Sequence, residues 1–98
     1  MNIQEAVHIL RSSADLRRDF SVRSFRIYGS LARGEAGPRS DIDVLVEFEP
    51  DAHIGLFEFV RLQQRLSERL GRPVDLATPD SLHKALRERI LREAVDAA

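Results

Sequence analysis

The sequence predicts an α/β (α+β) protein with a small mixed β-sheet packed on one face by helices. Two observations lead to this fold class. Short segments in which polar and apolar residues alternate are separated by longer segments with apolar residues at helical spacing. The chain has 98 residues, of which 43% are hydrophobic, enough for one modest core. We therefore expect a single domain that spans residues 1–98.

The first half of the chain is expected to form a helix and two strands. Residues 2–18 place apolar side chains at helical spacing. Residues 24–28 alternate up to Gly29, as a strand does, and residues 34–38 form a loop that contains two glycines and a proline. Residues 41–48 are the clearest strand, and one of its faces carries Ile42, Val44, Val46 and Phe48.

The second half is expected to form helix, strand and helix. Residues 55–70 are predicted to be helical and Gly71 to follow as the glycine after the helix. Residues 73–77 form a third short strand. Thr78 then has the character of a helix N-cap, before a final helix that runs to about Ala94 with Leu82, Leu86, Ile90 and Leu91 inward. The order becomes α-β-α-β-α-β-α if a short helix begins after Gly29.

Composition excludes several classes of protein. The net charge is −1, whereas a dedicated nucleic-acid binder usually carries a clear basic excess, so we expect no direct nucleic-acid binding. No apolar run is long enough to span a bilayer, and the N-terminus lacks the features of a signal peptide. The chain has no cysteine, hence no disulfide and no thiolate metal site. A cytoplasmic location, without a membrane partner, is therefore expected.

The most informative motif is Gly29-Ser30, followed after ten residues by Asp41-Ile42-Asp43. Side chains on a strand alternate between faces, so Asp41 and Asp43 point the same way, about 7 Å apart. The apolar face opposite them needs a core, which leaves the acidic face open. Asp75 lies between Val74 and Leu76 and is expected on the same open face, as a third acid.

These residue types suit a triphosphate held through metal ions. Neighbouring carboxylates repel each other unless a cation lies between them, and magnesium commonly bridges carboxylates to substrate phosphates. Gly29 lets the backbone approach a phosphate, and Ser30 adds a hydroxyl donor. Arg33 and Arg39 lie in the same loop and could neutralise phosphate oxygens. Each feature alone is more often an ordinary turn or surface charge; the combination favours a functional site.

The combined pattern resembles the nucleotidyltransferase superfamily, which has the DNA polymerase β-like catalytic fold. More closely, the chain resembles the minimal nucleotidyltransferase (MNT) antitoxins of HEPN–MNT toxin–antitoxin systems. The resemblance covers roughly residues 20–95 and is carried by the segments GSLARGEAGPRSDIDVLVEF and GRPVDLATPDSLHKALRERILREAV.

The resemblance implies transfer of AMP from ATP, with two Mg²⁺ ions, onto a tyrosine of a HEPN-type toxin, a ribonuclease that this modification silences. It assigns Asp41 and Asp43 to both metals and Asp75 to the catalytic metal, and Gly29 and Ser30 to the triphosphate. We add Arg33 to the nucleotide-binding residues because of its place in the loop. A chain of this size is expected to take its acceptor surface from the partner, in a hetero-oligomer.

Two other functions stay open from the sequence. The chain could be a non-catalytic antitoxin that masks the toxin by binding, because Arg61, Arg65 and Arg69 form a stripe on one helix. That stripe is otherwise an ordinary solvated helix face. The second alternative is a nucleotidyltransferase that acts on a small molecule such as an aminoglycoside. The three histidines share no metal-ligand spacing and are expected to be surface or partly buried residues.

Overall fold

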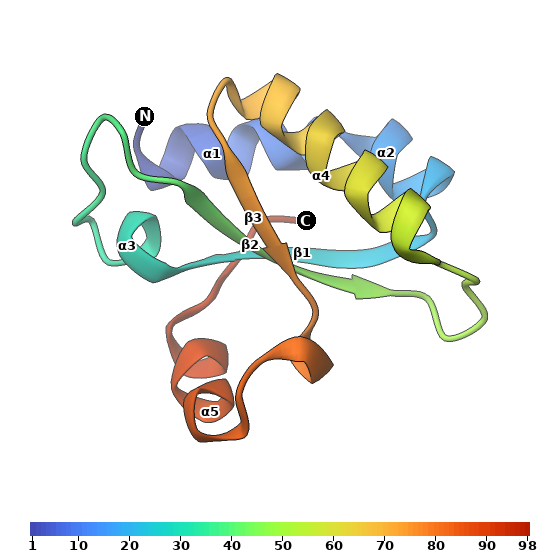
Figure 1. Cartoon of the computed structure of the whole chain (residues 1–98). Helices are drawn as coiled ribbons and strands as arrows, with labels where there is room; N and C mark the ends of the chain where they lie inside the picture. Colours follow the sequence, from blue (N-terminus) through green and yellow to red (C-terminus); the bar gives the residue numbers. More distant parts are fainter.

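The computed structural model describes all 98 residues. Figure 1 shows a curved sheet between a layer of helices on one side and a single helix on the other. The elements, in chain order, are helices α1 (Ile3–Arg11) and α2 (Ala14–Asp19), strand β1 (Val22–Tyr28), helix α3 (Gly29–Ala32), strand β2 (Ile42–Phe48), helix α4 (Leu56–Leu70), strand β3 (Val74–Ala77), the 3₁₀ turn η1 (Pro79–Ser81), helix α5 (Lys84–Glu93) and strand β4 (Val95–Asp96).

The sheet is mixed, as the sequence predicts. Its four strands lie in the order β3-β2-β1-β4. Strand β1 is antiparallel to both β2 and β4, whereas β2 and β3 are parallel. Strand β4 is not anticipated by the sequence because a strand of two residues is too short to show an alternating pattern.

Helices α1, α2 and α4 cover one face of the sheet and enclose the core (Figure 1). The apolar face predicted for β2 supplies Ile42, Val44 and Val46 to this core, all at most 1% exposed. Leu62 and Leu66 of α4 meet them from the helical layer. Burial of these aliphatic side chains is the main stabilising contribution of the fold.

The opposite face is more covered than the sequence suggests. Leu45 shares that face with Asp43 by alternation, yet it is only 2% exposed. Helix α5 lies on that side of the sheet (Figure 1). The open part of the acidic face is therefore confined to the end of the sheet where β2 and β3 begin.

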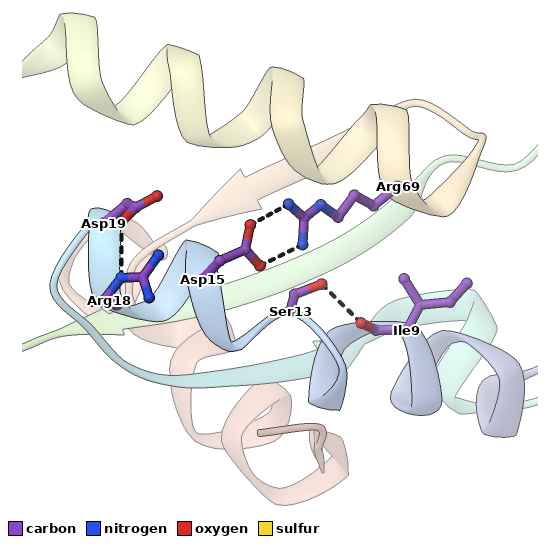
Figure 2. A network of polar contacts seen from close by, with 6 residues as sticks. All are labelled: Ile9, Ser13, Asp15, Arg18, Asp19 and Arg69. Carbon is purple, nitrogen blue, oxygen red and sulfur yellow. Dashed lines mark hydrogen bonds and ion pairs between the residues drawn. The ribbon is translucent and has the colours of Figure 1, made fainter.

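The helix predicted over residues 2–18 is broken into α1 and α2. The break falls at Ser12 and Ser13, whose hydroxyls donate to the carbonyls of His8 and Ile9 at 2.9 and 2.8 Å. Serine side chains compete with the backbone for these carbonyls and so favour a helix end. Figure 2 shows the contact between Ser13 and Ile9 beside the ion pair of Asp15 with Arg69.

Helix α4 and its ending agree with the prediction in outline. Gly71 adopts the left-handed conformation, with φ 68°, as expected for the residue after a helix. The start of α4 does not pack against the core, because Leu56 and Val60 are 79% and 43% exposed.

The final helix is shorter than predicted. Thr78 does act as a cap, since its Oγ1 accepts a hydrogen bond from the Ser81 N–H at 3.3 Å, but it caps only the turn η1. Leu82 is extended, and α5 starts afresh at Lys84. The inward placement predicted for Leu86 is wrong, because this side chain is 49% exposed. None of the helices has the length and apolar content needed to cross a membrane.

Candidate active site

Three side chains form a row across neighbouring strands at the open end of the sheet. Tyr28 at the end of β1 pairs with Asp43 of β2, and Asp43 pairs with Asp75 of β3. Directly opposed residues on paired strands project from the same face, so the two acids and the tyrosine share one surface. The structure thus brings together Asp43 and Asp75, which are 32 positions apart in the sequence.

Asp43 is the most perturbed acid of this group. Partial burial raises its pKa, and the negative charges of Asp75 and Asp41 raise it further. The guanidinium of Arg33 acts in the opposite direction, but does not cancel these effects. A carboxylate in such surroundings gains from a nearby cation.

Tyr28 completes the row on the β1 side. Burial raises the pKa of its hydroxyl to about 12, and the charges of Asp43 and Asp75 contribute to the shift. The hydroxyl therefore stays protonated at neutral pH and can act as a hydrogen-bond donor at the edge of the acidic surface.

Asp41 lies apart from the row. It is exposed, precedes the first residue of β2, and acts on Asp43 through its charge. The loop before it is held by Arg72, whose Nη2 donates to the carbonyl of Gly37 at 2.8 Å and to that of Ser40. No three acidic or histidine side chains lie close enough together to hold a metal ion by themselves. The three-acid set expected from the sequence is therefore not a preformed cage.

Gly29 forms the turn between β1 and α3. Its φ is +74°, a conformation that residues with a Cβ rarely adopt. A Cβ at this position would also lie 2.2 Å from Oδ2 of Asp43. Glycine is thus required twice, by the backbone conformation and by the close approach of the carboxylate.

Some hydrogen-bond donors of the turn at Gly29 have a partner within the chain, and others do not. The Gly29 N–H donates to Oε1 of Glu93 at 3.2 Å. The N–H groups of Ser30 and Leu31 and the hydroxyl of Ser30 have no hydrogen-bond partner within the chain. These free donors are available to an anion, whereas the N–H of Gly29 is already used.

Arg33 is engaged by two carboxylates. It forms ion pairs with Glu35 at 2.9 Å and with Glu93 at 3.1 Å. Arg39 is exposed in the same loop and forms no ion pair. Of the two arginines considered from the sequence, only Arg33 is close enough to Asp43 to influence its pKa.

Sequence reasoning missed two residues at this site. Glu93 is 64 positions from Gly29, and Arg72 is 32 positions from Ser40. Within its own helix Glu93 has an i+4 relation to Arg89, which accounts for an acid at that place without any distant role. Only the folded arrangement shows what either side chain contacts.

Known proteins match this chain along most of its length. The family model described as "Nucleotidyltransferase domain" matches residues 11–97. A candidate protein adenylyltransferase of Methanocaldococcus jannaschii is 44% identical over 96 residues, which cover 98% of this chain and 98% of the relative. Protein adenylyltransferase MntA of Thermococcus cleftensis is 38% identical over 96 residues, or 97% of this chain and 95% of the relative.

Solved structures share the fold. A structure described as a candidate minimal nucleotidyltransferase superposes with a TM-score of 0.79 at 35% identity, over 97% of this chain and 95% of that one. The MNT antitoxin in complex with a tri-AMPylated HEPN toxin of Shewanella oneidensis gives a TM-score of 0.66 at 19% identity, over 95% and 71% of the two chains. This second likeness concerns the fold alone. With the turn at Gly29 and the acids on β2 and β3 in place, the chain belongs to the nucleotidyltransferase domain family and is a nucleotidyltransferase.

Proposed function

We propose that this nucleotidyltransferase transfers AMP from ATP to a tyrosine of a cognate HEPN ribonuclease toxin and thereby neutralises it. The observation that carries the proposal is the arrangement of Gly29, Asp43 and Asp75 on three adjacent elements. Two relatives that are 44% and 38% identical to this chain are named as protein adenylyltransferases, which supports a protein as the acceptor.

The turn after β1 would hold the triphosphate. The free N–H groups of Ser30 and Leu31 and the Ser30 hydroxyl supply three unpaired donors at this turn. Consecutive backbone N–H groups with no internal partner form a concave site that suits phosphate oxygens. Gly29 contributes by leaving room for Asp43, and Arg33 contributes positive charge nearby.

Asp43 and Asp75, with Asp41 beside them, would hold two Mg²⁺ ions. Magnesium in nucleotide sites is usually bound through one or two carboxylates together with substrate phosphates and water, rather than by a complete protein cage. The adjacent pair Asp43 and Asp75 fits that requirement, even though no three side chains converge. Bound magnesium would supply electrostatic stabilisation of the charge that develops on the phosphate oxygens.

The transfer itself is a displacement at the α-phosphorus. The hydroxyl oxygen of the acceptor tyrosine forms a bond to this phosphorus, and the bond to the bridging oxygen breaks, so pyrophosphate leaves. The proton of the tyrosine hydroxyl passes to a nearby carboxylate, for which we propose Asp75. This residue is exposed on the acidic surface and so accessible to an acceptor from outside the chain.

A protein partner is also supported by the surface of α4. Leu56 and Phe57 at its start are 79% and 74% exposed, and Val60 lies one turn further on. Arg61 and Arg65 continue along the helix without ion-pair partners, whereas Arg69 of the predicted stripe is paired with Asp15 (Figure 2). Exposed apolar side chains grouped beside free charges are typical of a protein contact surface.

This surface also favours the alternative in which the chain neutralises the toxin by binding alone. One experiment with labelled ATP, Mg²⁺ and the HEPN protein distinguishes modification of the toxin from neutralisation by binding alone. Modification predicts label on a toxin tyrosine with the wild-type chain and none with Asp43→Asn. Glu47→Gln is the matched control, because Glu47 is on the same strand and the same face as Asp43.

The outcome for the toxin then decides between the alternatives. If Asp43→Asn still abolishes the ribonuclease activity at equal concentration, masking is sufficient and the proposed role of modification is wrong. If neither chain labels the toxin and both leave it active, both functions are rejected. We propose a cytoplasmic location for the reaction, where ATP is available, and no membrane or nucleic-acid partner.

A further inference from the structure

Glu93 joins the far end of the chain to the turn at Gly29. It is the last residue of α5, and its carboxylate oxygen Oε1 accepts hydrogen bonds from the Gly29 N–H at 3.2 Å and from Arg33 Nη1 at 3.1 Å. Its side chain is 21% exposed. One oxygen thus binds two groups of the turn that bears the proposed triphosphate donors.

The contact with Glu93 places Arg33 between the nucleotide turn and the acidic surface. Arg33 is bound to Glu93 on one side, and its charge acts on Asp43. The ion pair therefore limits the rotamers that this long side chain can adopt and keeps its guanidinium near the acidic surface. The same carboxylate fixes the orientation of the peptide that leads into Ser30.

A carboxylate at this place could instead be a substitute for a phosphate that leaves when ATP binds. The chain after Glu93 argues against such movement. Val95 and Asp96 pair with Ile27 and Arg26 of β1, and Ala97, which is fully buried, donates from its N–H to the carbonyl of Phe25 at 2.9 Å. The backbone at Glu93 is thus anchored to the sheet within two residues. The carboxylate can leave the turn only by rotation of its own side chain, with loss of its hydrogen bonds to Gly29 and Arg33.

We propose that Glu93 is a positioning residue of the nucleotide site, whose single carboxylate oxygen fixes the Gly29 peptide and the Arg33 guanidinium relative to the acids. The donors left free for the triphosphate are then those of Ser30 and Leu31. The identity of the ligand rests on the proposed function.

The variants Glu93→Ala and Glu93→Gln test this role. We expect Glu93→Ala to weaken Mg-ATP binding and to raise KM for ATP by about tenfold, the usual effect of losing a charged hydrogen bond. The value of kcat should change less, because the substitution alters the nucleotide turn and leaves the acids in place. Glu93→Gln should recover part of the loss, since its amide oxygen still accepts from Gly29 N–H.

Two controls make the result specific. Glu88→Ala removes an exposed acid from the same helix and should leave ATP binding unchanged. In the double variant Arg33→Ala, Glu93→Ala the losses should be less than additive, because Glu93 acts partly through Arg33. Thermal unfolding of each variant separates loss of the fold from loss of positioning, and Glu93→Gln provides the test if Glu93→Ala fails to fold.

The outcomes are distinguishable from failure of the proposed function. Tighter ATP binding by Glu93→Ala would show that the carboxylate competes with a phosphate, which overturns the positioning role. Unchanged binding and KM in both variants would also overturn it and leave the proposed function intact. Absence of Mg-ATP binding by the wild-type chain would reject the proposed function, and the positioning role with it.

Discussion

Gly29 and Asp43 lie so close that a methyl group on Gly29 would be 2.2 Å from Oδ2 of the carboxylate. The turn that ends β1 and the acid on β2 are therefore parts of one packed unit. A side chain cannot be added at the turn without displacing the acid, although the two residues are 14 positions apart in the sequence.

We predict that Gly29→Ala lowers the transferase activity about 100-fold, because the Asp43 carboxylate must leave its present position beside Asp75. Gly34→Ala is a matched control, since Gly34 also has φ +74° but a Cβ there would meet no atom within 4 Å. Both variants bear backbone strain of about 1–3 kcal/mol, whereas only the first has the clash. Equal activities in steady-state assays of the two variants would contradict this account.

A second prediction concerns the stability cost of Asp43. Its pKa in the folded chain is raised by burial and by the charges of Asp75 and Asp41. Between the unfolded value of 3.8 and the higher folded value, the folded state binds more protons, so stability falls as pH rises through this window. Asp43→Asn should remove the unfavourable effect of the ionised carboxylate and raise the free energy of unfolding at pH 7 by about 0.5 kcal/mol after solvent screening. The same substitution should abolish activity.

Urea unfolding of the wild type and Asp43→Asn at several pH values measures this effect. The difference in unfolding free energy should grow as the pH rises above 3.8 through the raised pKa of Asp43, and then stay constant. A variant that is less stable than the wild type at pH 7 would show that the carboxylate is net stabilising, against the sign derived from its surroundings.

A third prediction concerns the ion pair of Asp15 with Arg69 (Figure 2). This pair contributes stability that is lost as the pH falls, opposite to the effect of Asp43. The hydrogen bonds from Arg69 lower the pKa of Asp15 from 3.8 to about 2. The stability that this pair contributes is complete above pH 3.8 and is lost as pH falls toward 2. Asp15→Asn should therefore show a shallower acid-induced loss of stability than the wild type, with Asp19→Asn as the control. Identical acid unfolding curves for wild type and Asp15→Asn would contradict it.

Local patterns in the sequence were sufficient to predict the strands that bear the acids. Alternation in β2 placed Asp43 opposite the core residues, and the short apolar flanks of Asp75 did the same for β3. Their pairing in register confirms that both acids share a face. These predictions succeed because the period of a strand is set by its backbone and needs no knowledge of distant contacts.

Features that depend on tertiary contacts could not be predicted in the same way. The pattern of β2 does not reveal that Leu45 is buried on the acidic side, because this depends on which later segments of the chain lie over that face. The partner of Glu93 is 64 residues away, and no periodicity encodes it. The division of α1 from α2 depends on the hydrogen bonds from the hydroxyls of Ser12 and Ser13 to the carbonyls of His8 and Ile9. A continued helix and a helix end at these serines are nearly equal in local preference, so the sequence pattern does not distinguish them.

The last prediction concerns Arg72, which holds the loop that leads to Asp41. Its guanidinium donates to the carbonyls of Gly37 and Ser40, and the residue lies just before β3. We expect Arg72→Ala to free this loop and to lower transfer about tenfold, through the loss of charged hydrogen bonds that fix Asp41 relative to Asp75. Hydrogen exchange should increase at residues 37–41 and stay unchanged in α4.

Arg39→Ala is the control for this prediction, because Arg39 lies in the same loop but is exposed and unpaired. It removes the same charge and leaves both carbonyl contacts in place. If the two variants lose activity equally without a change in hydrogen exchange, positive charge near the nucleotide is what matters, and the loop does not depend on Arg72. If only Arg72→Ala shows both effects, the position of Asp41 is set from the start of β3, by a side chain that acts through the backbone of the loop.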